Sequence, residues 1–199
     1  MKKVRAKGKK DENRNQKIII GLIIAFIMVS SVLGYYGAQS KEQAYTYKGI
    51  KFTAQKNGLL LAKISNHDFY FNYLPQSLVN MSFNSSVLDP LKATKLIYTT
   101  SDIKSPLIQS LSEAEYLLTQ ELMQLSIYSI GGYTTNTTTG RGRITCDNAT
   151  AITPVIMFEY ANKTSAYLEG QCLHIAGNSR LDLLALKDRM LYGLLGILR

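Results

Sequence analysis

The hydrophobic pattern of the chain changes character near residue 40. The run 18–40, IIIGLIIAFIMVSSVLGYYGAQS, contains no charged residue. At about 1.5 Å of rise per residue, a helix of this length covers the roughly 30 Å hydrocarbon core of a bilayer. Beyond it, polar and apolar residues alternate with the shorter periods of strands and amphipathic helices. The pattern predicts one transmembrane helix, 18–40, followed by a folded domain.

Short alternating segments predict a β-meander over residues 49–74. Residues 50–54 (IKFTA) have the period of two that a half-buried strand shows. Asn57-Gly58 favours the positive backbone angles of a tight hairpin turn, and Asn66-His67-Asp68 marks the next turn. Pro75 should end the third strand. A polar stalk over 41–48 would join this meander to the membrane helix.

After a loop at 76–94, in which one short helix stays open, the pattern predicts alternating strands and helices. We expect strands at 95–100, 127–130, 155–160 and 165–177, and helices at 105–126 and 180–198. In the first helix the leucines recur at spacings of three and four, which places them on one face. Gly131-Gly132 should end the second strand, and 134–143 should be a loop. This order predicts an α/β (α+β) domain over 49–199: a mixed sheet carrying the meander, one long helix, a β-hairpin and a C-terminal helix.

The positive charge of the chain is concentrated before the apolar run. The formal net charge is +9, and residues 1–17 hold eight basic and two acidic side chains. Basic residues beside a transmembrane helix are retained in the cytoplasm. The tail 1–17 should therefore be cytoplasmic and residues 41–199 extracytoplasmic. Since the rest of the chain is nearly balanced, the high pI does not indicate nucleic acid as a partner.

Two other interpretations of the apolar run stay open. Cleavage after a signal peptide is one, because Ala38-Gln39-Ser40 provides small residues in a suitable order. The other is a pilin-like subunit whose apolar helix builds a filament, although Gly8 is separated from the run by KKDENRNQK.

The two cysteines of the chain, Cys146 and Cys172, both fall in the predicted extracytoplasmic part. In an oxidising compartment such a pair is expected to form a disulfide. Their spacing fits no zinc motif, because there is no CxxC pair. The sequence therefore predicts a disulfide, no metal and no cofactor.

Glycosylation triplets lie in the same part of the chain. Roughly two Asn-X-Ser/Thr matches are expected by chance, and five occur after the apolar run. Their asparagines are Asn80, Asn84, Asn136, Asn148 and Asn162. The excess and its position indicate an outward-facing glycoprotein.

Catalytic signatures are absent from the sequence. It contains no GxSxG, HExxH, P-loop or GxGxxG motif. His67 falls in a predicted turn. His174 alternates with Leu173 and Ile175, so it should face away from them as a satisfied surface histidine. Gly140-Arg141-Gly142-Arg143 is a basic loop tip, and Arg141 and Arg143 are candidate contacts for a phosphate or an acidic glycan.

Two resemblances to known groups of proteins add to these predictions. Thr153-Pro154 before a predicted hairpin and a terminal helix resembles the layout of thioredoxin-like domains over 95–199, although the redox CxxC of that family is missing. The run CDNAT…TPVI…NKT…EGQC, followed by DLL…KDRMLYGLLGI, resembles uncharacterised single-pass membrane proteins of archaea. That resemblance implies an envelope location and carries no assigned activity.

Together these features predict a membrane-anchored binding or scaffolding protein of the cell envelope. Its partners would be the lipid bilayer and an envelope protein, a glycan or the surface layer. An extracytoplasmic enzyme or a thiol-handling domain that uses His174, Cys146 or Cys172 is the alternative. The sequence leaves the oligomeric state open.

Overall fold

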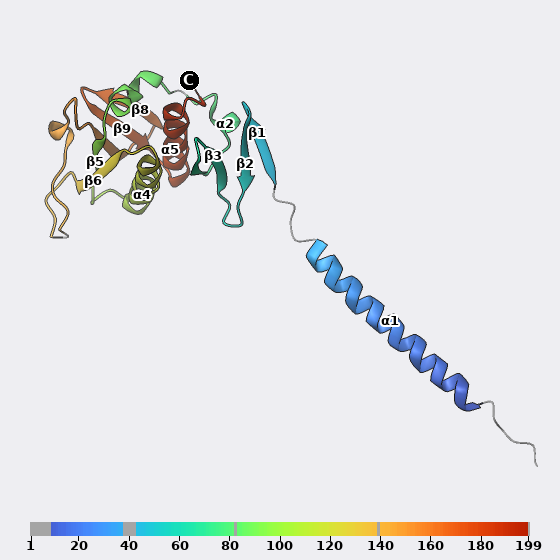
Figure 1. Ribbon diagram of the computed structural model, residues 1–199. Coiled ribbons are helices and arrows are strands. Elements are labelled where there is room, and N and C mark those ends of the chain that lie inside the picture. The colour runs from blue at the N-terminus through green and yellow to red at the C-terminus, as the bar shows by residue number, and fades with distance from the viewer. Residues whose placement is uncertain (1–8, 38–42, 82, 139, 199) are drawn as a thin grey trace, which may run out of the picture. The chain divides into compact units, whose positions relative to one another are not determined.

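The computed structural model describes the chain except for residues 1–8, 38–42, 82, 139 and 199 (Figure 1). The chain divides into two compact units, Met1–Gln43 and Ala44–Arg199. Each is described here by itself.

The first unit contains the helix α1 (Lys9–Gly37). Its apolar side chains are open to the surroundings: Ile18, Leu22 and Phe26 are 55%, 66% and 74% exposed. Over the described ranges, 9–37 and 43–198 with gaps at 82 and 139, no helix combines the length and apolar content that crossing a bilayer requires. The transmembrane helix predicted at 18–40 is therefore not found, and its last residues, 38–40, lie outside the described ones.

The second unit begins with an antiparallel sheet of four consecutive strands, β1 (Ala44–Tyr47), β2 (Ile50–Ala54), β3 (Leu60–Ile64) and β4 (His67–Phe71). The predicted meander is confirmed, with two corrections. Residues 44–47, expected in the stalk, form β1, because Lys48-Gly49 adopts positive φ and turns the chain back onto β2. His67 belongs to β4, since the preceding turn is made by Ser65-Asn66, both at positive φ.

Three short helical segments connect the two sheets. They are α2 (Pro75–Leu78), the 3-10 turn η1 (Ser85–Leu88) and α3 (Asp89–Lys92). Pro75 and Pro90 each lie in the first turn of a helix, where a missing N–H costs nothing. The residues predicted as a loop after the meander are thus mostly helical turns.

The second sheet has the order β6-β5-β7-β9-β8. Its strands are β5 (Leu96–Ser101), β6 (Tyr128–Tyr133), β7 (Val155–Tyr160), β8 (Ser165–Glu169) and β9 (Cys172–Gly177). Strands β6, β5, β7 and β9 are parallel, and β8 pairs antiparallel with β9 at the edge. The helices α4 (Ile108–Gln124) and α5 (Arg180–Leu194) follow β5 and β9. The mixed α+β class predicted for the domain is confirmed.

Details of this sheet differ from the predictions. Strand β6 continues through Gly131-Gly132, and the strand expected at 165–177 is a hairpin that turns at Gly170, whose φ is +59°. The strand after Pro154, β7, runs parallel to β5 and pairs with β9, so it is not part of a hairpin. The hairpin position that the thioredoxin resemblance implies is therefore wrong.

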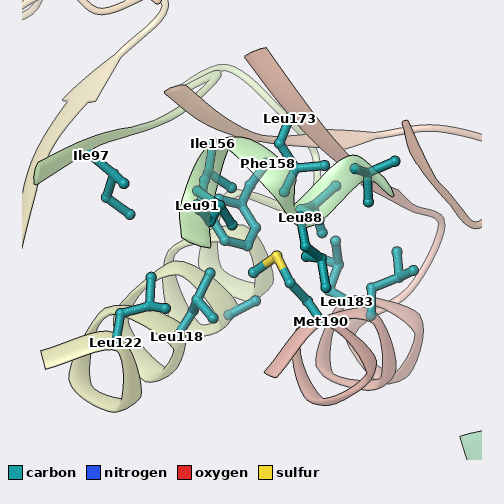
Figure 2. Packing of buried hydrophobic residues seen from close by; sticks show 14 of the residues in the cluster. Leu88, Leu91, Ile97, Leu118, Leu122, Ile156, Phe158, Leu173, Leu183 and Met190 are labelled. Atoms are coloured by element: carbon teal, nitrogen blue, oxygen red, sulfur yellow. The ribbon is translucent and has the colours of Figure 1, made fainter. Parts of the chain in front are cut away.

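The helices α4 and α5 lie between the two sheets (Figure 1). On one side, leucines of α4 and α5 pack on Ile97, Ile156 and Phe158 of the parallel sheet, and Figure 2 shows Met190 reaching from α5 toward this group. On the other side, Tyr192 stacks on Phe71 of β4 with ring centroids 4.2 Å apart. A helix with a sheet on both sides has no solvent face, so residues 183–192 are buried even where they are charged.

Buried charges on α5 connect the layers. The Asp188 carboxylate accepts hydrogen bonds from the backbone N–H groups of Asn72 and Tyr73, at 2.6 and 2.8 Å. It also pairs with Lys187, at 2.5 Å from Nζ to Oδ1. Both side chains are fully enclosed, and a buried charge is tolerated when it is paired and hydrogen-bonded. This cluster fixes the end of β4 to α5.

Candidate functional site

A cleft lies where three parallel strands of the second sheet end. It has a volume of about 320 Å³ and is lined by residues that follow β5, residues at the end of β7, and Thr134 after β6. The chain leaves β5 toward β6 on one side, whereas β7 continues toward β9 on the other. Ligands of open parallel sheets bind at such switch points, outside the carboxyl ends of the strands. The sheet topology therefore selects this cleft as the candidate binding site.

The loop after β5 supplies one wall of the cleft. Asp102 accepts a hydrogen bond from the Lys104 backbone N–H at 2.9 Å, and the Ser105 N–H bonds back to the Asp102 carbonyl at 3.0 Å. Asp102, Lys104 and Ser105 of this turn all line the cleft. The wall thus has residues of both charges and one hydroxyl residue.

Glu159 and Tyr160 at the end of β7 supply the opposite wall. Glu159 Oε1 accepts a hydrogen bond from the Tyr167 hydroxyl at 2.9 Å and lies 3.3 Å from His174 Nδ1. The hydrogen bond with His174 lowers the pKa of Glu159, and this outweighs the opposing effect of burial. Burial, followed by the hydrogen bond to Glu159, raises the pKa of Tyr167 to about 12. Glu159 is therefore an ionised carboxylate at neutral pH, held in place by two neighbours.

His174 lies directly behind this wall, on the sheet face opposite α4 and α5. Its imidazole is 4% exposed and stacks on Tyr167, with ring centroids 4.4 Å apart. Nε2 lies 3.4 Å from Cys146 Sγ and 3.4 Å from Glu169 Oε2. The prediction that His174 faces away from Leu173 and Ile175 is confirmed, but the residue is buried, because the loop carrying Cys146 covers it.

The sulfur atoms of Cys146 and Cys172 are 2.02 Å apart, the distance of the predicted disulfide. Cys172 is fully buried on β9, and Cys146 lies in the short turn η2 (Cys146–Asn148). The bond therefore fastens the loop between β6 and β7 to the outer face of the sheet. Ile144, Val155 and Tyr98 pack beside it.

The arginines of the basic loop tip do not line the cleft, although Arg143 contacts Thr134 at its edge. Arg141 Nη1 is 3.7 Å from Glu115 Oε1, and its guanidinium stacks on the Tyr133 ring at 5.5 Å. Arg143 Nε donates to the Thr134 carbonyl at 3.1 Å. The structure thus directs Arg141 toward a carboxylate, while the prediction of an anion contact at Arg141 and Arg143 stays a prediction.

Glu115 lines a second cleft, of about 350 Å³, between α4 and β6. Its carboxylate is 5% exposed and accepts a hydrogen bond from the Thr99 hydroxyl at 2.8 Å. Burial raises the pKa of this carboxyl, against the smaller effects of Thr99 and Arg141. The neighbouring strand β6, whose Gly131 lies beside the Glu115 carboxylate, contributes to its burial.

The other predicted sites are spread over the surface of the domain. The five asparagines of the triplets are exposed: Asn80, Asn84, Asn136, Asn148 and Asn162. In Asn84 and Asn148 the side-chain oxygen accepts a backbone N–H, which leaves the amide nitrogen directed elsewhere. His67 is exposed and its Nδ1 lies 3.2 Å from Gln124 Oε1, away from His174. Glycosylation of these sites stays a prediction.

The sequence does not predict the pairing of Glu159 with His174. The strands expected at 155–160 and 165–177 are neighbours in the sequence, whereas β7 in fact pairs with β9. The alternation of Cys172 and His174 places both on one face of β9, but it does not say which strand lies beside that face.

Comparisons with known protein families, curated proteins and solved structures found no match to this chain.

Proposed function

We propose that the protein is an extracytoplasmic binding module of the cell envelope, held at the membrane by its N-terminal segment, and that it binds a glycan in the cleft at the carboxyl ends of β5 and β7. The observation that carries the proposal is the position of this cleft at the switch point of the parallel sheet.

The chemistry of the cleft suits a polyhydroxylated ligand. Sugar hydroxyls both donate and accept hydrogen bonds, and the cleft offers Asp102 and Glu159 as acceptors and Lys104 as a donor. The ring of Tyr160, 46% exposed, gives an apolar surface against which a sugar ring can stack. The volume of about 320 Å³ lies in the range of small-ligand sites.

The N-terminal segment supports a place at the membrane. The uncharged run 18–40 follows a basic tail, and the large apolar side chains between Ile18 and Val32 of α1 are exposed. An apolar helix surface of this kind is expected to contact lipid or another apolar surface rather than water. The disulfide and the five exposed triplets favour the extracytoplasmic side.

Binding to oligosaccharides tests the proposal. The detergent-solubilised full chain should retain a subset of a panel of neutral and acidic oligosaccharides, measured by glycan array and then by calorimetry. Tyr160→Ala should weaken binding about tenfold, because one stacked aromatic ring contributes roughly 1–1.5 kcal/mol. Tyr128→Ala is the matched control, since Tyr128 on β6 is also exposed, by 60%, and does not line the cleft. Equal affinities of the two variants, or no binding to any oligosaccharide, would refute the proposal.

A further inference from the structure

The surroundings of His174 Nε2 are rich in groups that ligate metals. Within the described residues, Cys146, Cys172 and His174 place one ligand atom each within 4.8 Å of one another. The Glu169 carboxylate adds a fourth, 3.4 Å from Nε2. Two thiolates, one imidazole and one carboxylate form a donor set suited to Zn²⁺.

We propose that the pair Cys146 and Cys172, once reduced, forms a four-coordinate site for Zn²⁺ together with His174 and Glu169. The disulfide and the metal are then alternative states of one site. Neither the spacing of the cysteines nor any motif predicted it, because the ligands come together through strand pairing and a covering loop.

The spacing of the ligand atoms fits a tetrahedral ion. Bonds of about 2.0–2.3 Å to nitrogen, oxygen and sulfur place neighbouring ligand atoms about 3.3–3.8 Å apart. The Nε2 atom already lies at 3.4 Å from both Cys146 Sγ and Glu169 Oε2. The two sulfur atoms, now bonded at 2.02 Å, must separate by about 1.7 Å. The ligand atoms of the two cysteines and His174 lie within 4.8 Å of one another, so small side-chain shifts complete the tetrahedron.

Three of the four ligands are fixed on one hairpin. In the register of β8 and β9, Glu169 lies opposite Cys172, and Cys172 and His174 share a face of β9. Cys146 comes from the loop between β6 and β7, which is the part able to adjust when the sulfur–sulfur bond opens. Glu169 is mostly exposed, so an ion can enter from its side.

Contacts with Glu159 and Tyr167 orient the His174 imidazole so that it can bind a metal. Glu159 Oε1 faces Nδ1 at 3.3 Å and can accept a hydrogen bond from Nδ1–H, which leaves the lone pair on Nε2, the atom 3.4 Å from Cys146 Sγ. A carboxylate behind a ligating histidine is a common arrangement in zinc sites and fixes the orientation of the ring. The stacked Tyr167 ring prevents the imidazole from turning away.

The redox step balances with a dithiol as the reductant. The dithiol gives two electrons and two protons to the Cys146–Cys172 bond and becomes a disulfide itself, and the protein disulfide becomes two thiols. Binding of Zn²⁺ then displaces the two thiol protons. In the laboratory a phosphine serves the same purpose, with water supplying the oxygen of the phosphine oxide.

Cobalt spectroscopy tests the site. The full chain in detergent, reduced by a phosphine under anaerobic conditions, should develop the visible bands of tetrahedral Co²⁺ and a thiolate-to-cobalt charge-transfer band, and Zn²⁺ should remove both. The oxidised chain should show neither. His174→Ala and Cys146→Ser should lose the tetrahedral spectrum. Glu159→Gln should weaken Co²⁺ binding about 10–100-fold, as loss of an outer carboxylate does at other sites.

His67→Ala is the matched control and should bind Co²⁺ like the parent chain, since His67 is exposed on β4 away from the site. If reduction unfolds the domain, the comparison of His174→Ala with His67→Ala still tests the site, because an unfolded chain would bind Co²⁺ equally well through either histidine. No charge-transfer band in the reduced chain, or identical spectra for His174→Ala and His67→Ala, would overturn the proposal. Failure here leaves glycan binding intact, because Cys146 does not line the cleft.

Discussion

At the scale of single residues, the burial of Glu121 should make stability depend on pH. This carboxyl on α4 is 7% exposed, and its Oε1 accepts the Tyr70 N–H at 3.0 Å. Burial, opposed mainly by that hydrogen bond, raises its pKa from 4.5 to about 7. Between these values the folded chain holds a proton that the unfolded chain has released. The free energy of unfolding should therefore fall as pH rises from 4.5 to 7, by up to about 1.4 kcal/mol per pH unit from this group.

The variant Glu121→Gln isolates this effect. The amide keeps an oxygen that can accept the Tyr70 N–H and does not titrate. Urea unfolding of both chains across the same pH range gives the difference in unfolding free energy. The parent chain should lose stability relative to the variant as pH rises toward 7, and the difference should be constant above it. Parallel curves from pH 4.5 to 7 would show that Glu121 ionises in the folded chain as it does in water.

Single residues were also where sequence reasoning was weakest. The face of His174 followed from simple alternation in a strand, and the cysteine pair followed from the oxidising compartment that the apolar run implied. The contacts that give His174 its surroundings involve Glu159, which is 15 residues away along the chain. Such a contact depends on which strands are neighbours, and local patterns contain no information about that.

At the scale of elements, local signals were sufficient for the two long helices α4 and α5 and for three strands of the meander, β2 to β4. The leucine spacing found α4, and Asn57-Gly58 found a hairpin turn, with Gly58 at φ +83°. Strand order was not accessible in this way: β6 and β7 flank β5, and β8 lies at the edge although it falls between β7 and β9 in the sequence. The cleft exists because of that strand order. The sequence therefore predicted elements that surround the cleft but did not predict the cleft itself.

The contact between β6 and the loop 134–153 gives a prediction for this scale. A Cβ atom at Gly132 would lie 2.6 Å from the Gly142 carbonyl oxygen and 2.6 Å from Ile144 Cδ1. Gly132→Ala must therefore displace the loop, and overpacking of this kind costs about 1–3 kcal/mol. Denaturant unfolding should show this loss, whereas Gly142→Ala, whose Cβ has open space around it, should change stability by less than about 0.5 kcal/mol. Equal stability of the two variants would mean that β6 and the loop are not in close contact.

At the scale of the whole molecule, the two units have opposite surfaces. The domain buries an apolar core between its two sheets, whereas α1 exposes isoleucine, leucine and phenylalanine over residues 18–32. The first arrangement is stable in water by itself, and the second requires another apolar phase. No described helix has the length and apolar content that crossing a bilayer requires. The side of the membrane on which the domain lies is therefore tested by labelling.

Labelling of intact cells with a membrane-impermeant amine reagent shows on which side of the membrane the domain lies. Lys51, Lys63, Lys92 and Lys163 are exposed on the domain and should be modified in intact cells, whereas the lysines of the tail 1–17 should react only after detergent is added. The chain should also stay with the membrane through alkaline extraction. In the variant Arg14→Gln/Lys17→Gln, loss of the bases nearest the apolar run should leave a fraction of chains inverted, because those charges oppose translocation of the tail. Domain lysines that react only after lysis, or a chain found in the soluble fraction, would place the domain in a reducing compartment, where Cys146 and Cys172 would be thiols rather than a disulfide.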